Sequence, residues 1–241
     1  MKSEAQLHQQ TRFGRYSDYL GEFVYGGIDG SVTTFAVVAG SAGADLPVKI
    51  VLILGFANLI ADGFSMSVGN FLSVKSEIDN YNKHKKTEYW EVENIPEAEK
   101  QEIREIYTKK GFKGEMLEKI VTTITADKDL WVNVMMKEEL EMQEPNKSPY
   151  HTAGATFISF VSVGVIPLLV YIYQYLANII VDSNFLISSV LTGLAFIIIG
   201  YLRSYVTLTN RFVSVLQTLL LGTAAALLAY FVGAFLKDLL V

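Results

Sequence analysis

The sequence of 241 residues contains no cysteine, only five prolines and only three histidines. Without thiols the chain cannot form a disulfide bond or a thiolate metal site, so a bound metal would need carboxylate, amide, thioether or imidazole ligands. The three histidines are far apart in the sequence and form no ligand-spaced cluster. A phosphate-binding loop, a nucleotide fingerprint and a nucleophile–base motif are also missing, which argues against an enzyme and against an ATP-driven pump.

Charged residues are scarce outside one window. Residues 75–147 contain thirteen of the twenty Lys and Arg residues and seventeen of the twenty-five Asp and Glu residues. Hydrophobic residues make up 51% of the chain, and its mean hydropathy is +0.30. This distribution predicts a membrane protein with one polar insertion. The net charge of −5 argues against a nucleic-acid partner and is compatible with cations.

Five stretches are apolar and long enough to cross a bilayer, which takes about 20 helical residues. They lie near 22–44, 49–74, 152–176, 184–203 and 212–237. We therefore predict an all-α, polytopic membrane protein with five transmembrane helices. The expected division is residues 1–74 (N-terminal tail and helices 1–2), 75–150 (helical insertion) and 151–241 (helices 3–5).

The insertion has the pattern of three short amphipathic helices. Pro96 is a plausible first residue of one helix, and Gly111 is a plausible stop. A second helix is indicated by apolar residues at helical spacing after Gly114, and Asp127 or Asp129 is expected to cap a third.

Basic residues beside the predicted spans indicate the orientation. In a five-helix topology, the basic window falls on the same side as Arg12, Arg15, Arg203 and Arg211, and the other side keeps only Lys49 and Lys237. Because positive charge concentrates on the cytoplasmic side, the N-terminus and the insertion are expected there.

Two predicted spans carry ionisable residues at bilayer depth, where they are costly and usually functional. Glu22 and Asp29 lie seven residues apart on one face of the first helix; Asp62, Met66 and Asn70 share one face of the second. Together they would line a column of oxygen and sulfur ligands for a transition-metal cation. The alternative is that Asp29 makes an inter-helix hydrogen bond and Met66 fills a gap. Nearby, a GxxxG spacing would let two helix backbones approach closely.

Glutamates recur three residues apart in the insertion, as in Glu88/Glu91 and Glu99/Glu102, and a Met-Met pair precedes Glu139. Such a carboxylate pair can bind one divalent cation from one helix face, and methionine favours softer metals. The alternative is a solvated helix face on which the glutamates pair with lysine and arginine.

Two motifs resemble the vacuolar iron transporter family: GGIDGSVTTFAVVAGSAGA in the first predicted helix and ADGFSMSVGNFLSVKSE in the second. The resemblance covers nearly the whole chain. It implies a homodimeric iron(II)/proton antiporter, often also moving manganese out of the cytosol, with Asp29 and Met66 in the translocation pathway. It also implies that the insertion is a cytosolic metal-binding domain with the ligands Glu88, Glu91, Glu99, Glu102, Met135, Met136 and Glu139.

The chain departs from the family pattern at two positions. Many members have Glu at the place of Asn70 and a small residue at the place of Asp62, so the carboxylate would have moved along the pathway. The short chain, rich in Lys, Ile and Asn, is more like a prokaryotic plasma-membrane protein; in a eukaryote the vacuolar membrane is expected.

We therefore expect a transporter that exports Fe²⁺ from the cytosol in exchange for protons, with Asp62, Asn70 and Glu22 assisting Asp29 and Met66. One alternative is a membrane-anchored iron store or ferroxidase, although the Glu-x-x-His pattern of such helical sites is absent from the sequence. Another alternative is a mainly manganese exporter, because oxygen-rich sites discriminate poorly between Mn²⁺ and Fe²⁺.

Overall fold

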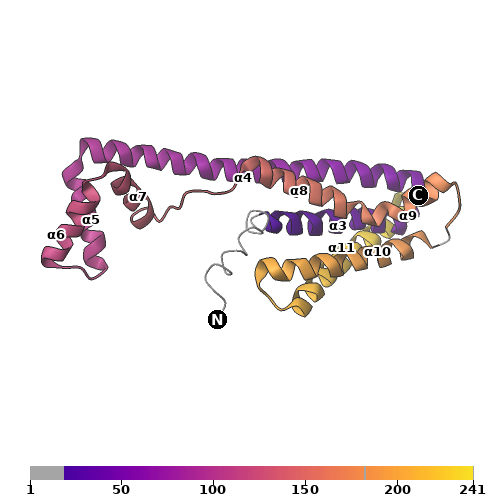
Figure 1. Ribbon diagram of the computed structural model, residues 1–241. Coiled ribbons are helices and arrows are strands. Elements are labelled where there is room, and N and C mark those ends of the chain that lie inside the picture. The colour runs from indigo at the N-terminus through magenta and orange to yellow at the C-terminus, as the bar shows by residue number, and fades with distance from the viewer. Residues whose placement is uncertain (1–18, 182, 241) are drawn as a thin grey trace. The chain divides into compact units, whose positions relative to one another are not determined.

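A computed structural model describes residues 19–181 and 183–240, so the N-terminal tail, with Arg12 and Arg15, lies outside the described residues (Figure 1). The described residues contain helices and no strand, which confirms the all-α prediction. The helices are α3 (Leu20–Gly43), α4 (Val48–Asn94), α5 (Pro96–Lys109), α6 (Gly114–Thr125), α7 (Lys128–Glu138), α8 (Pro149–Gly164), the 3₁₀ turn η2 (Ile166–Leu168), α9 (Leu169–Ala177), α10 (Asn184–Thr207) and α11 (Arg211–Leu240).

The chain divides into two compact units. Of the described residues, one unit comprises those up to Phe71 and those from Ser148 onward, and the other is Leu72–Lys147. The long helix α4 contributes its first half to the former and its second half to the latter. Five segments are long and apolar enough to cross a membrane, namely α3, α4, α8–α9, α10 and α11. The apolar part of α4 is its first half, since the charged window begins at Lys75.

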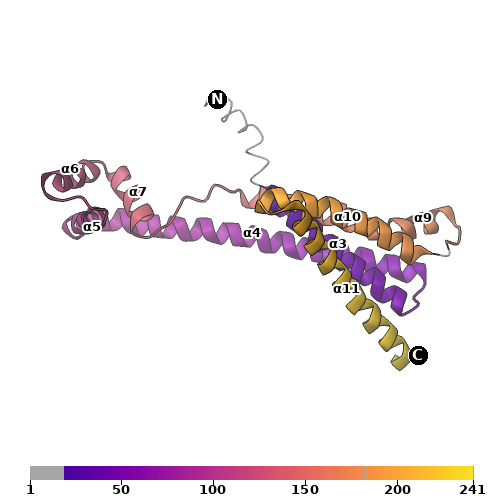
Figure 2. The same ribbon diagram turned by 90° about the horizontal axis from the view of Figure 1, so that it is seen from below.

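Helix α3 is the centre of the first unit, because α8, α10 and α11 all pack against it (Figure 1). Figure 2 shows α10 and α11 beside α3 from a second direction. Glycines make this possible. A Cβ atom on Gly30 would lie 2.4 Å from the carbonyl oxygen of Phe160 in α8, and one on Gly26 would lie 2.8 Å from that of Thr156. On α11, a Cβ atom on Gly233 would lie 2.1 Å from the carbonyl oxygen of Gly40. The close approach indicated by the GxxxG spacing is thus found between α3 and α8.

The predicted third span is not one continuous helix. It breaks at η2, where Pro167 has no N–H to donate to the preceding turn. The hydroxyl of Ser188 in α10 donates a 2.6 Å hydrogen bond to the carbonyl oxygen of Pro167. The carbonyl oxygen of Pro167 at this break therefore has its hydrogen-bond partner in a neighbouring helix. The sequence of the 152–176 segment alone did not reveal this contact.

The second unit has its own hydrophobic core. Residues from α4, α5, α6 and α7 form it, including the fully buried Ile103, Val132, Met135 and Met136. Helix α7 begins after Asp127, whose side chain accepts hydrogen bonds from the backbone N–H groups of the second and third residues after it. This confirms one of the two expected caps.

The glycine contact of α3 leads to a stability prediction. Gly30→Ala places a methyl group against the immobile backbone of α8 and should lower the melting midpoint by about 5 °C, since overpacking costs roughly 1–3 kcal/mol. Gly193→Ala is the matched control, because a Cβ atom there meets nothing within 4 Å. The measurement is circular dichroism at 222 nm of the purified protein during heating. Equal midpoints for the two variants would contradict the close packing.

Candidate functional site

The polar residues of the two N-terminal spans lie on α3 and α4. Asp29 is exposed at the surface of the first unit, and its carboxylate interacts electrostatically with that of Asp62. Met66 and Asn70 follow Asp62 at successive turns of α4 and are half-buried. The amide of Asn70 donates a 2.8 Å hydrogen bond to the hydroxyl of Thr156 in α8. The structure therefore brings the two aspartates within electrostatic reach, while Asn70 is engaged with a neighbouring helix.

Glu22 lies in the first turn of α3, two turns before Asp29, and is half-buried. Sequence reasoning missed Asn58, whose amide donates a hydrogen bond to the Asp62 carboxylate. The side-chain oxygen of Asn58 is itself buried and without a hydrogen-bond partner. The sequence did contain an indication of this contact, because Asn58 precedes Asp62 by four residues and so lies on the same helical face.

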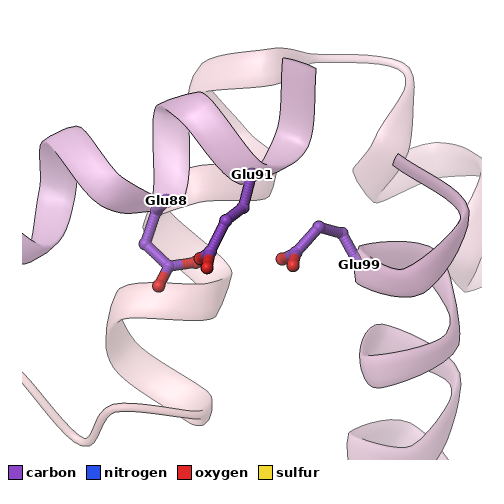
Figure 3. Close-up of side chains that lie close together, drawn as sticks. All are labelled: Glu88, Glu91 and Glu99. Atoms are coloured by element: carbon purple, nitrogen blue, oxygen red, sulfur yellow. The ribbon is translucent and has the colours of Figure 1, made fainter. Parts of the chain in front are cut away.

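Three glutamates of the second unit converge on one point. Glu88 and Glu91 come from α4 and Glu99 from the start of α5, and each offers a carboxylate oxygen within 4.8 Å of the others (Figure 3). Glu88 and Glu99 are only 4% and 3% exposed, and each has one buried oxygen without a hydrogen-bond partner. Such a cage of hard oxygen atoms suits a divalent cation.

Two more predicted glutamates belong to the same electrostatic group. Burial first, and then the negative charges of Glu139, Glu91 and Glu102, together raise the pKa of Glu88 to about 7. Burial likewise raises the pKa of Glu99 to about 7, with Glu102 the largest charge contribution. The pKa of Glu139 is also raised, first by burial and then by its neighbours Glu102 and Glu91. All five glutamates therefore repel one another in one place.

Four other glutamates of the insertion form salt bridges. Salt bridges join Lys100 to Glu97, Arg104 to Glu118, Lys110 to Glu138 and Lys128 to Glu93. These cations are thus occupied by exposed or half-exposed carboxylates outside the five-glutamate group. The alternative of a solvated, ion-paired face describes these four glutamates, whereas Glu88, Glu91, Glu99, Glu102 and Glu139 form no salt bridge within the described residues.

Met135 and Met136 lie in the hydrophobic core of the second unit and are 0% and 1% exposed. Their contacts with aromatic and aliphatic side chains explain their burial without a metal. Ligation by their sulfur atoms stays a prediction, as do the roles of the other predicted site residues.

The raised pKa values of Glu88 and Glu99 predict how metal-free stability depends on pH. The folded unit holds these protons up to about pH 7, whereas the unfolded chain releases them near pH 4.5. Their stabilising contribution is therefore complete below pH 4.5 and is lost as the pH rises to 7. Without metal, the second unit should be less stable at pH 8 than at pH 5 by an amount on the order of 2 kcal/mol.

Urea unfolding followed by tryptophan emission measures this difference, since both tryptophans of the chain, Trp90 and Trp131, lie in the second unit. The samples contain a chelator. Glu88→Gln should flatten the pH dependence, whereas Glu97→Gln should not, because Lys100 lowers the pKa of Glu97 to below this range. If the wild type were as stable at pH 8 as at pH 5, or more stable, the carboxylates of Glu88 and Glu99 would not be buried together.

Comparison with known proteins places the chain in a family. A sequence model of the VIT family matches residues 20–234. A vacuolar iron transporter of Toxoplasma gondii is 36% identical over 238 residues, which are 95% of this chain and 78% of the relative. The vacuolar iron transporter 1 of Eucalyptus grandis is 32% identical, covering 92% of this chain and 88% of the relative. That of Oryza sativa subsp. japonica is 30% identical, covering 95% and 89%. Because the family model covers most of the chain and these relatives are 30–36% identical over nearly all of it, the protein belongs to the VIT family, as its two N-terminal motifs predicted.

Proposed function

We propose that this protein is an integral membrane transporter that moves Fe²⁺ out of the cytosol in exchange for protons, and that it also accepts Mn²⁺. The buried convergence of Glu88, Glu91 and Glu99 carries the proposal, because carboxylates without cationic partners are costly unless they bind a proton or a metal. The relatives named as vacuolar iron transporters and the five candidate spans support iron as the cargo and the membrane as the location.

In this proposal the second unit captures the cation on the cytosolic side. Glu88, Glu91 and Glu99 supply the first oxygen ligands, and Glu102 and Glu139 add negative charge and further ligands. Since metal binding requires ionised carboxylates, capture releases the protons that Glu88 and Glu99 hold near pH 7. Met135 and Met136 would add sulfur ligands only if their side chains turned out of the core.

The pathway through the bilayer would use Asp29 and Met66, assisted by Asp62, Asn70 and Glu22. The electrostatic interaction of Asp29 with Asp62 supports this, since a cation between two carboxylates relieves their repulsion and displaces protons. Asn58 would hold Asp62 in position through its hydrogen bond. Proton return would use the same carboxylates, which is the physical basis of the proposed exchange.

A homodimer with the pathway at its interface completes the proposal. In the single chain, α4 exposes Ile60 and Phe64 beside its polar face, and Asp29 is exposed on α3. A second copy would cover these residues and enclose the carboxylates. The proposed location is a prokaryotic plasma membrane, or a vacuolar membrane in a eukaryote, with the insertion in the cytoplasm.

Manganese is included because the converging ligands are oxygens, which discriminate poorly between Mn²⁺ and Fe²⁺. Iron storage or oxidation is the weaker alternative, because the converging carboxylates come without a Glu-x-x-His motif in the sequence. We therefore propose a transporter and not an enzyme.

Transport by wild-type protein in liposomes tests the pathway. With anaerobic Fe²⁺ supplied on the side of the second unit and a pH dye on the other, iron should cross as protons move in the opposite direction. Asp29→Asn should lower the rate about tenfold or more, and Met66→Ala should lower it in the same direction, because each removes a proposed ligand.

Asp45→Asn and Met116→Ala are the matched controls, since Asp45 is 82% exposed in its ion pair with Lys237 and Met116 is 59% exposed. Both should transport at the wild-type rate. Iron movement by Asp29→Asn at the wild-type rate would contradict the pathway, and iron movement without proton movement would contradict the exchange.

Metal binding by the second unit is tested separately. In the full-length protein, Glu88→Gln should weaken Mn²⁺ binding at pH 7.5 by about tenfold or more, because it removes one of three converging ligands. Isothermal titration calorimetry gives the dissociation constant. Glu97→Gln removes the same charge from an exposed carboxylate paired with Lys100 and should bind as the wild type does. Equal affinities of the two variants would show that the glutamate cluster is not the binding site.

A further inference from the structure

A groove lies at one end of the first unit, between the start of α4 and the end of α8–α9. It encloses a cavity of about 540 Å³, within the usual size range of ligand pockets. Its walls are apolar: Leu52, Ile53 and Phe56 come from α4, and Ile172 and Leu176 come from α9. It lies apart from the polar face of Asp62 and Met66 and plays no part in the proposed transport.

A second, more polar cavity of about 650 Å³ adjoins the groove. The two cavities share Lys49, Tyr175 and Leu176, and the second also reaches Gln174 and Asn178. The site thus has an apolar body and a polar mouth. Lys49 is the second residue of α4, and Tyr175 is in the last turn of α9, so both lie at the ends of candidate membrane spans. Lysine and tyrosine at such ends lie at the level of the lipid headgroups.

The mouth of the groove carries positive charge. Within the described part of the chain, the ammonium group of Lys49 makes no hydrogen bond or salt bridge, and the lining residues of both cavities include no Asp or Glu. The nearby acidic residue Asp45 is instead paired with Lys237, at 3.3 Å between Nζ and Oδ2. A free ammonium group is therefore left beside an apolar groove.

We propose that this groove binds an anionic phospholipid, with one acyl chain between α4 and α9 and the headgroup phosphate at Lys49. The tyrosine hydroxyl of Tyr175 is placed at the same mouth and can donate a hydrogen bond to the phosphate. A small anion would leave the apolar cavity unfilled, and an apolar protein surface would leave the ammonium group without a partner. An anionic lipid matches both parts of the site.

The test compares two lipids with identical chains on the delipidated full-length protein. Native mass spectrometry should show tighter binding of phosphatidylglycerol than of phosphatidylcholine. Lys49→Ala should weaken phosphatidylglycerol binding about fivefold, as expected for one basic residue at a membrane surface. Lys49→Arg should still bind phosphatidylglycerol more tightly than phosphatidylcholine. Lys237→Ala is the matched control, since it removes one cation that is already paired with Asp45 and should bind as the wild type does.

Filling the groove gives an independent readout. Ile172→Trp should weaken binding of both lipids, provided that its melting midpoint and elution volume match those of the wild type; if it does not fold, Leu52→Phe replaces it.

Equal binding of the two lipids by the wild type, or equal losses in Lys49→Ala and Lys237→Ala, would overturn the proposal. Displacement of phosphatidylglycerol by inorganic phosphate alone would indicate a small-anion site, and a changed subunit number in Ile172→Trp would indicate that a second copy covers the groove. Either result would also overturn it.

Discussion

A carboxylate held away from water must be neutralised by a proton or a cation, and the two groups of acidic residues in this protein depend on that constraint. In the second unit Lys100, Arg104, Lys110 and Lys128 are paired with other glutamates, and within the described residues the buried Glu88 and Glu99 form no salt bridge. The raised pKa values of Glu88 and Glu99 reflect the free-energy cost of ionising carboxylates that are buried beside other negative charges. A divalent cation removes the repulsion and the proton together, which links metal capture to proton release.

The supporting structure holds these groups in place by different means in the two units. In the first, the glycines of α3 bring its backbone against α8 and α11, so the helix that carries Asp29 is fixed by close backbone contact. In the second, a hydrophobic core of α4, α5, α6 and α7 residues holds the helices that carry the glutamates. Rigid support of this kind keeps repelling carboxylates together when no cation is present.

The methionines show how one residue type can serve packing and chemistry at once. Met135 and Met136 are entirely enclosed in the core of the second unit, which accounts for their conformation by packing alone. Met66, in contrast, is half-buried on the polar face of α4. A flexible, polarisable side chain fills an apolar space and remains a potential soft ligand, so the same Met-rich pattern fits both roles.

The sequence by itself determined what depends on neighbours along the chain. Helix periodicity, the Asp127 cap and the small residues Gly26 and Gly30 are local signals, and each is found where its pattern placed it.

Other features depend on residues far apart in the sequence. The tertiary structure alone decided that five glutamates from three segments meet in one place while four others pair with basic residues. It also decided that α4 continues without a break to Asn94, and that Ser188 satisfies the helix break at Pro167. Spacing along one helix shows which side chains share a face, but charge pairing and burial depend on which faces the folded chain brings together.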